Sequence, residues 1–217
     1  NTCTFCSVHC LYRGKYIRRS IPEVIRDIKK VKELGFNKFI LLDDNIASDQ
    51  EYMFNLSQEI KKLKMQWMSQ CSITVAKNEK LLKAIAESGC TVLSFGIESI
   101  QQESLNELNK GWAKTSEYPE LMAKIRGVGI EISTEMVVGT DADTLESIAA
   151  TAQFINQNKI IIPRFYILTP IPGTDLFKRL EEKNKIYNRD IYSYNGTEAV
   201  HIPAKMTPEE LTQAYWQ

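Results

Sequence analysis

Residues 81–98 read LLKAIAESGCTVLSFGIE, and this stretch contains one complete unit of the predicted fold. Leu81 to Ser88 has the apolar spacing of an amphipathic helix. Gly89 ends the helix, Thr91 to Phe95 is a short apolar strand, and Gly96-Ile97-Glu98 ends that strand. A helix followed directly by a buried strand is typical of a parallel α/β sheet.

The same order of elements recurs on both sides of this unit. Apolar periodicity predicts helices over residues 22–34, 51–63, 121–128, 143–157 and 176–183. Apolar runs predict strands over residues 38–43, 67–74, 91–98, 130–138 and 160–168. These strands are mostly apolar along their whole length, which is typical of strands covered on both faces. The sequence therefore predicts an α/β fold made of right-handed βαβ units.

Composition narrows the classes of function. The 217 residues include 27 basic and 27 acidic side chains, so an overall basic surface for nucleic acid is not expected. A local patch of Arg13, Lys15, Arg18 and Arg19 could still meet a phosphate or a carboxylate, or be a solvated loop. No apolar run approaches the roughly 20 residues of a membrane span, and no signal peptide precedes the first cysteines, so we expect a cytoplasmic location.

Three of the five cysteines, Cys3, Cys6 and Cys10, lie close together at the start of the chain. Cys71 and Cys90 lie within apolar patterns and are expected in the core. Closely spaced thiolates on a short loop are typical ligands of an iron–sulfur cluster or of zinc. The first stretch of the chain is therefore the candidate metal site.

A zinc knuckle formed by Cys3, Cys6, His9 and Cys10 is one interpretation of this loop, and the chain would then be a zinc-stapled α/β binding module without catalysis. The identity of the metal separates the two hypotheses. A hydrolase is not indicated, because only His9 and His201 could act as imidazole bases and neither lies near a GxSxG turn. No GxGxxG motif follows a strand, so dinucleotide binding is not indicated either.

The placement of Phe5 directly before Cys6 resembles the radical S-adenosylmethionine (SAM) enzymes, whose cluster loop is CxxxCxΦC with an aromatic residue Φ before the third cysteine. Cys3 and Cys6 match the second and third cysteines, and the first would lie two positions upstream of Asn1. Cys10 does not fit this spacing and is interpreted as a neighbour. The resemblance implies a 4Fe-4S cluster held by Cys3 and Cys6, with SAM as the second cofactor.

The resemblance also implies a partial TIM-like (β/α)6 barrel whose first strand would precede the cysteine loop. Residues 1–184 would form the barrel domain, and 185–217 would begin a C-terminal extension or a following module. Active-site groups of parallel barrels gather at the carboxyl ends of the strands. The polar residues expected there, and assigned by resemblance to the SAM site together with Phe5, are Asp43, Asp44, Asn45, Glu98, Lys110 and Glu135.

In such a site the 43–45 motif receives the methionine amino group, Glu98 and Glu135 accept hydrogen bonds from ribose hydroxyls, and Lys110 faces the SAM carboxylate. The implied reaction is reductive cleavage of SAM to a deoxyadenosyl radical, which attacks a small-molecule substrate. An electron donor such as flavodoxin or ferredoxin is implied as a partner. No catalytic residue beyond the cofactor site is assigned.

The Asp43-Asp44-Asn45 run resembles the subgroup of these enzymes that carries a cobalamin-binding domain ahead of the barrel. The resemblance therefore implies cobalamin, bound by a domain outside this chain, and a cobalamin-dependent methyltransferase or a related enzyme. The alternative within the same family is a methylthiotransferase that acts on tRNA or protein. The substrate itself is not determined by the sequence.

Overall fold

The protein contains one sheet of parallel strands in the order β1-β2-β3-β4-β5. The computed structural model describes residues 3–12 and 15–217, without the side chain of His9. The strands are β1 (Lys38–Ile40), β2 (Gln66–Cys71), β3 (Cys90–Glu98), β4 (Glu131–Val138) and β5 (Ile162–Ile167). Consecutive strands are neighbours in the sheet, as successive βαβ units require.

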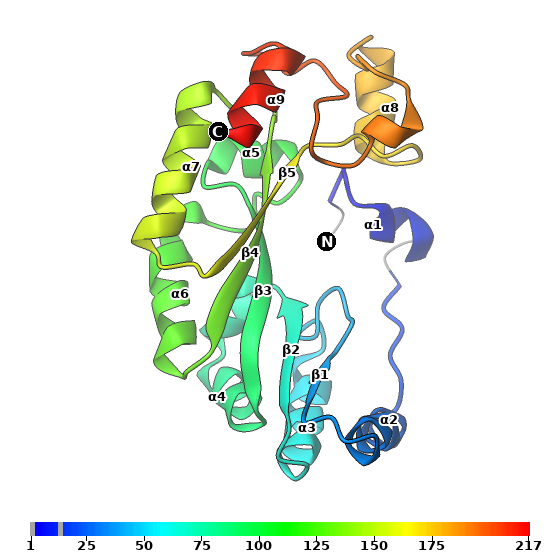
Figure 1. Ribbon diagram of the computed structural model, residues 1–217, viewed down its shortest axis with the longest axis vertical. Coiled ribbons are helices and arrows are strands. Elements are labelled where there is room, and N and C mark those ends of the chain that lie inside the picture. The colour runs from blue at the N-terminus through cyan, green and yellow to red at the C-terminus, as the bar shows by residue number, and fades with distance from the viewer. Residues whose placement is uncertain (1–2, 13–14) are drawn as a thin grey trace.

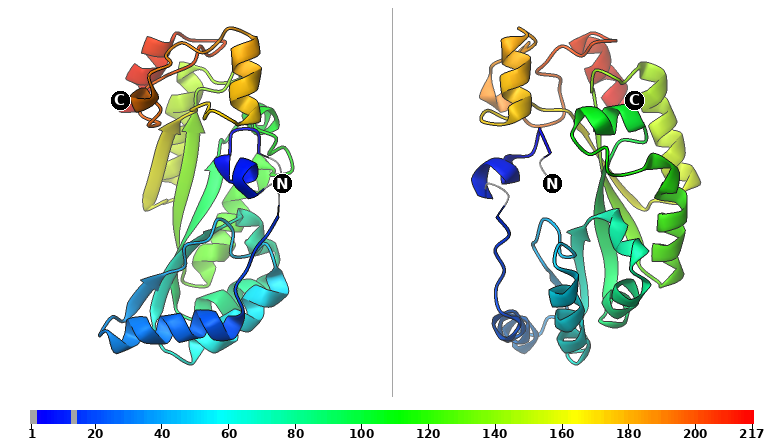
Figure 2. Two further views of the ribbon diagram at one scale, coloured as in Figure 1. Left: turned by 90° about the vertical axis from the view of Figure 1, so that its right-hand side faces the viewer. Right: turned by 180° about the vertical axis from the view of Figure 1, so that it is seen from behind.

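Helices alternate with the strands, and most of them cover one face of the sheet (Figure 1). They are α1 (Ser7–Tyr12), α2 (Ile21–Glu33), α3 (Gln50–Lys61), α4 (Glu79–Glu87), α5 (Gln102–Glu107), α6 (Tyr118–Gly127), α7 (Leu145–Gln157), α8 (Asp175–Glu182) and α9 (Pro208–Trp216). Figure 1 shows α6 and α7 on the left of a curved sheet and α1 on its other side, and Figure 2 shows the same arrangement from behind. The sheet is thus curled into part of a barrel, with α2, α3, α4, α6 and α7 outside it and α1 on its open side (Figure 1).

The core lies between the helices and the outer face of the sheet. Trp67, Leu93, Phe95 and Met136 are each at most 1% exposed and belong to one cluster with apolar side chains of α2, α3, α4 and α6. Alternate residues of each strand point away from this core because the side chains of a strand alternate between faces. The helix-covered face therefore supplies the hydrophobic stabilisation of the fold.

The inner face differs from the sequence prediction that these mostly apolar strands are covered on both faces. Ser94 of β3, Ser133 and Glu135 of β4, and Arg164 of β5 are linked by hydrogen bonds and lie on one face. That prediction was wrong for these strands, because the helices cover only the opposite face. The polar inner face is where a barrel of this type can hold a ligand.

Several element boundaries also differ from prediction. The strand predicted over 38–43 ends at Ile40, and the strand predicted over 67–74 ends at Cys71. Residues Ile73–Lys77 form a 3-10 helix instead, capped by the side chain of Ser72, which accepts a hydrogen bond from the backbone of Thr74. The helices α1 and α5 were not predicted because six residues are too few to show a 3.6-residue period.

The segment after residue 184 packs on the carboxyl ends of β4 and β5. Val138 and Ile167 share a buried cluster with Ala199, Met206 and Leu211. The buried ring of His201 lies 2.8 Å from the carbonyl oxygen of Gly139, measured from Nε2. These contacts attach the tail to the barrel, whereas the division of the chain at residue 184 into two units stays a prediction.

Gly139→Ala is expected to destabilise this attachment by about 2 kcal/mol. Gly139 has φ of +96°, and an added Cβ would lie 2.5 Å from Cδ2 of the fully buried Leu211. Gly129→Ala is the matched control, because φ is +84° there but the added carbon meets nothing within 4 Å. In urea unfolding, the control should lose about 1 kcal/mol of its free energy of unfolding. Equal losses in Gly139→Ala and Gly129→Ala would contradict the packing argument.

Candidate functional site

The cysteine loop is fixed above the carboxyl ends of β4 and β5. The backbone N–H of Thr4 donates to the carbonyl of Leu108 at 3.4 Å, and the N–H of Leu176 donates to the carbonyl of Thr4 at 2.9 Å. Phe5 packs against a separate apolar cluster made of Leu108, Val137, Leu168, Leu176 and Leu180. These contacts hold the loop between the end of α5 and the start of α8.

The thiols of Cys3 and Cys6 line a cavity of about 1070 Å³. The same cavity is lined by Asp43, Asp44, Asn45, Ser94 and Arg164, so the first cysteines and the β1 loop face one space, as the sequence predicts. Cys10 does not line it, and its Sγ lies 3.2 Å from the carbonyl oxygen of Gly173. The donor set fits two thiolate positions of an iron–sulfur cluster.

Asn45 holds the β1 loop in place. Its side-chain oxygen accepts hydrogen bonds from the backbone N–H groups of Ala47, at 3.3 Å, and Ser72, at 3.2 Å. The link to Ser72 ties the loop after β1 to the loop after β2. Asp43 and Asp44 are exposed beside it. The structure thus gives Asn45 a scaffolding contact and leaves the two carboxylates open to the cavity.

Glu98 and Lys110 form a buried ion pair close to Cys3. Nζ of Lys110 lies 2.5 Å from Oε1 of Glu98, and the two side chains are 14% and 8% exposed. Burial raises the pKa of the Cys3 thiol, the nearby Lys110 cation opposes that rise, and Glu98 adds to it. The predicted strand-end acid, the predicted lysine and a predicted cluster ligand are therefore brought together.

Glu98 has an unusual backbone conformation. Its φ is +61°, a left-handed value that is costly for a residue with a side chain, and the register with β4 shifts between Gly96 and Glu98. An added Cβ at Gly96 would lie 2.6 Å from Oε1 of Glu98 and 3.1 Å from Nζ of Lys110. The bulge and the glycine together make room for the ion pair on the strand.

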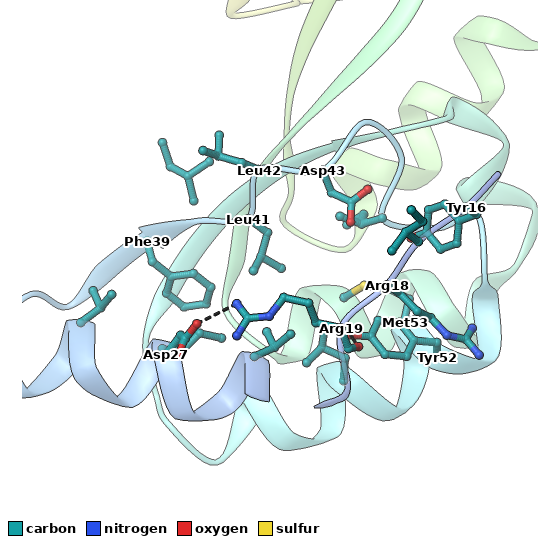
Figure 3. Close-up of a pocket in the computed structure, with 17 residues that line it drawn as sticks. Tyr16, Arg18, Arg19, Asp27, Phe39, Leu41, Leu42, Asp43, Tyr52 and Met53 are labelled. Atoms are coloured by element: carbon teal, nitrogen blue, oxygen red, sulfur yellow. Dashed lines mark hydrogen bonds and ion pairs between the residues drawn. The ribbon is translucent and has the colours of Figure 1, made fainter. Parts of the chain in front are cut away.

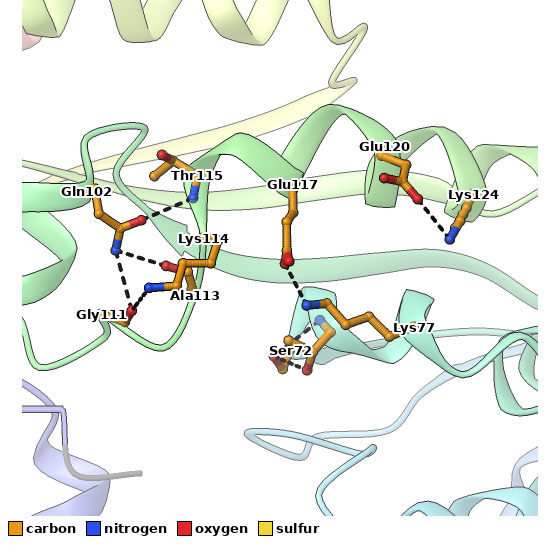
Figure 4. Close-up of polar contacts among 11 residues, drawn as sticks. Ser72, Lys77, Gln102, Gly111, Ala113, Lys114, Thr115, Glu117, Glu120 and Lys124 are labelled. Carbon is orange, nitrogen blue, oxygen red and sulfur yellow. Dashed lines mark hydrogen bonds and ion pairs between the residues drawn. The ribbon is translucent and has the colours of Figure 1, made fainter.

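Gln102 holds the loop that carries Lys110. Its Nε2 donates to the carbonyl of Ala113 at 3.0 Å, and its Oε1 accepts from the N–H of Thr115 at 3.3 Å (Figure 4). The backbone N–H of Lys110 donates to the carbonyl of Leu105 at 2.7 Å. Sequence reasoning did not single out Gln102, since its partners lie on a loop whose path the sequence does not reveal.

Glu135 lies on the inner face within β4 (Glu131–Val138) and not at the end of the strand, and it has a partner that was not predicted. NH2 of Arg164 lies 2.5 Å from Oε1 of Glu135, and the Ser94 hydroxyl donates to the same oxygen at 3.0 Å. The Glu135 side chain is 19% exposed and the Arg164 side chain 45% exposed. Arg164 was missed although it is the one charged residue within the apolar run 160–168.

A second cavity, of about 410 Å³, lies between residues 16–19, α2, α3 and β1 (Figure 3). Its walls are mostly apolar, and Arg19 at its rim is paired with Asp27 at 2.7 Å. Arg18 is paired with Asp49 and stacks on the Tyr52 ring. These ion pairs explain Arg18 and Arg19 of the predicted basic patch, and Arg13 lies outside the described residues.

Among the residues that the structure describes, no three cysteine, histidine, aspartate or glutamate side chains form a group that could hold a metal ion. The zinc hypothesis also requires His9, whose side chain lies outside the described residues. In the same part of the chain, no helix combines the length and apolar character needed to cross a membrane.

Residues 1–155 match the family model of the radical SAM superfamily. The chain belongs to the radical SAM superfamily. Membership in the radical SAM superfamily implies SAM and an iron–sulfur cluster as cofactors. The resemblance seen in the cysteine loop is therefore confirmed.

Among relatives, the bacteriochlorophyllide d C-12(1)-methyltransferase of Chlorobaculum tepidum is 29% identical over 216 residues, covering 98% of this chain and 47% of the relative. The anaerobic magnesium-protoporphyrin IX monomethyl ester cyclase of Cereibacter sphaeroides is 27% identical, covering 97% of this chain and 35% of the relative. The radical SAM chain thus spans about half the length, or less, of these curated relatives.

Among solved structures, the radical SAM methyltransferase TsrM of Kitasatospora setae, with tryptophan substrate and a SAM analogue bound, superposes with a TM-score of 0.74. The sequence identity is 17%, and the match covers 99% of this chain and 43% of TsrM. This likeness confirms the partial barrel fold of the radical SAM family.

Proposed function

We propose that this radical SAM chain is the catalytic domain of a methyltransferase that uses SAM and cobalamin, the latter bound by a domain outside residues 1–217. The observation that carries the proposal is the single cavity onto which Cys3, Cys6 and the 43–45 loop converge. The relatives named as methyltransferases support the transfer of a methyl group. The structural neighbour TsrM, which was also solved with cobalamin and a 4Fe-4S cluster, supports the cofactors.

Each predicted site residue is proposed to act on these cofactors. Cys3 and Cys6 would supply two thiolates to a 4Fe-4S cluster, and the third would come from outside these residues. The backbone of 43–45 would receive the SAM amino group, and Glu98 and Glu135 the ribose hydroxyls. Phe5 would support the loop from its apolar cluster. When bound, the cluster supplies the electron that cleaves SAM.

The Glu98–Lys110 pair would orient the SAM carboxylate. Lys110 is buried against the carboxylate of Glu98 and lies near Cys3. Its ammonium group is therefore held at one position and would bind the SAM carboxylate without rearrangement. The 45%-exposed Arg164 and the apolar residues at the cavity mouth would face the substrate. A small-molecule substrate, a donor such as flavodoxin or ferredoxin, and a cytoplasmic location stay predictions.

Anaerobic purification with the natural flanking sequence tests the proposal. We expect about four irons and four sulfides per chain, together with a visible spectrum that changes when SAM is added. Stoichiometric zinc without sulfide would instead support a structural knuckle and overturn the proposal. Transfer of a sulfur-containing group to tRNA or protein, detected by mass spectrometry, would favour the methylthiotransferase.

A further inference from the structure

The cavity that contains Cys3 and Cys6 has two unlike sides. Near β1 its lining includes the apolar side chains of Ile17, Ile40 and Leu42. Arg164 lines the cavity from β5, the strand at the opposite end of the sheet. An apolar wall opposite an ordered cation suits a ligand that is apolar over most of its area and carries one anionic group.

Arg164 is held in a fixed orientation by inner-face residues. Its NH2 group contacts Oε1 of Glu135 at 2.5 Å and donates to the hydroxyls of Ser94, at 2.9 Å, and Ser133, at 3.4 Å. Within the described residues no hydrogen bond engages its Nε or NH1 group. A guanidinium fixed through NH2 keeps the donors of Nε and NH1 available, and NH1 can make a charge-assisted hydrogen bond to one carboxylate oxygen.

The other charges that line the cavity decide which way such a ligand lies. Asp43 and Asp44 line the cavity from the loop after β1, on the same side as the apolar wall. They would repel a carboxylate placed there. Lys15 also lines the cavity, but Arg164 is the cation that an ion pair and hydrogen bonds hold in place, so we place the acid group toward β5. The volume of about 1070 Å³ is large enough for a body of several hundred Å³ beside the cofactors.

We propose that the substrate is a broad apolar carboxylic acid whose carboxylate is bound by Arg164 and whose apolar body lies on Ile17, Ile40 and Leu42. This inference rests on the proposed function and adds the substrate class to it. Arg164 already shares its charge with Glu135, so a substrate carboxylate would gain charge-assisted hydrogen bonds from the remaining donors, and such bonds are about twice as strong as neutral ones.

The probe is protoporphyrin IX, a broad apolar ring with two carboxylates, compared with its dimethyl ester, which has the same ring without charge. Binding is measured by fluorescence titration to the protein with its natural flanking sequence. We expect the wild-type protein to bind the acid about tenfold more tightly than the ester. In Arg164→Gln the two affinities should become equal, with the affinity for the ester unchanged.

Lys15→Gln is the matched control, because Lys15 also lines the cavity and its loss removes the same charge. The control should keep the preference for the acid. Loss of the preference in Lys15→Gln but not in Arg164→Gln would overturn the assignment. Arg164→Lys guards against misfolding, since it keeps a cation beside Glu135. A single ammonium has no second nitrogen for the ligand, so its preference should fall at least threefold.

Two further measurements separate this proposal from the proposed function. Arg164 contacts Glu135, the proposed ribose ligand, so Arg164→Gln can weaken SAM binding without any contact to the SAM carboxylate. The affinities for SAM and for decarboxylated SAM, measured by calorimetry, should therefore change by the same factor. A loss about tenfold larger for SAM would mean that the carboxylate bound by Arg164 belongs to SAM, which overturns the substrate assignment. The iron and sulfide content of the wild-type protein tests the proposed function alone, because the porphyrin preference requires no cluster.

Discussion

Cys6→Ala is expected to remove the iron–sulfur cluster, and with it all cleavage of SAM, and Cys3→Ala is expected to do the same. Cys3 and Cys6 both line the cavity of about 1070 Å³. A cluster held by three thiolates loses a third of its protein ligands with either substitution, so iron should fall from about four per chain to near zero. The measurement is iron and sulfide content after anaerobic reconstitution of the protein with its natural flanking sequence.

Cys10→Ala is the matched control for these two variants. Its thiol lies on the same short segment but contacts the carbonyl of Gly173, outside the lining of the cavity. We expect Cys10→Ala to keep the full iron content. Full iron loading in Cys3→Ala or Cys6→Ala, or complete loss in Cys10→Ala, would show that the ligand assignment is wrong.

The fold was largely predictable because each αβ unit carries its own local signals. Glycines at 35, 89 and 129 follow three of the helices and have positive φ, so each marks a boundary between a helix and a strand. The boundaries that failed, at the ends of β1 and β2, depend on contacts between loops. Asn45 bonds to Ser72 across two loops, and no local pattern reports that contact.

The candidate site was predictable only in part. Glu98 and Glu135 were proposed because acids at or near the ends of apolar strands matched the family resemblance. Glu98 ends β3, whereas Glu135 lies within β4. Arg164 was missed, although a single cation within the apolar run 160–168 is an equally strong signal. Its partner Glu135 is 29 residues away in sequence and directly opposite in the sheet register. The pairing of Glu135 with Arg164 therefore depends on the strand register, which the composition of the sequence does not reveal.

Gly96→Ala is expected to disrupt the Glu98–Lys110 pair and to cost about 3 kcal/mol of stability. The added carbon would lie 2.6 Å from Oε1 of Glu98 and 3.1 Å from Nζ of Lys110. Neither end can move freely, because the two side chains are 8% and 14% exposed. Urea unfolding measures the loss of stability. If the pair orients SAM as proposed, the affinity for SAM should also fall at least tenfold, and calorimetry measures that affinity.

Gly127→Ala is the control for the change of residue type, since an added carbon there meets nothing within 4 Å. It should leave SAM binding intact and stability unchanged or slightly higher. The double variant Gly96→Ala with Glu98→Ala isolates the cause. Residues in contact give non-additive effects, so the added methyl should cost much less once the Glu98 side chain has been truncated. If the losses in the free energy of unfolding are additive, the added methyl clashes with another part of β3. Gly96 would then be required by the packing of the strand and not by the ion pair.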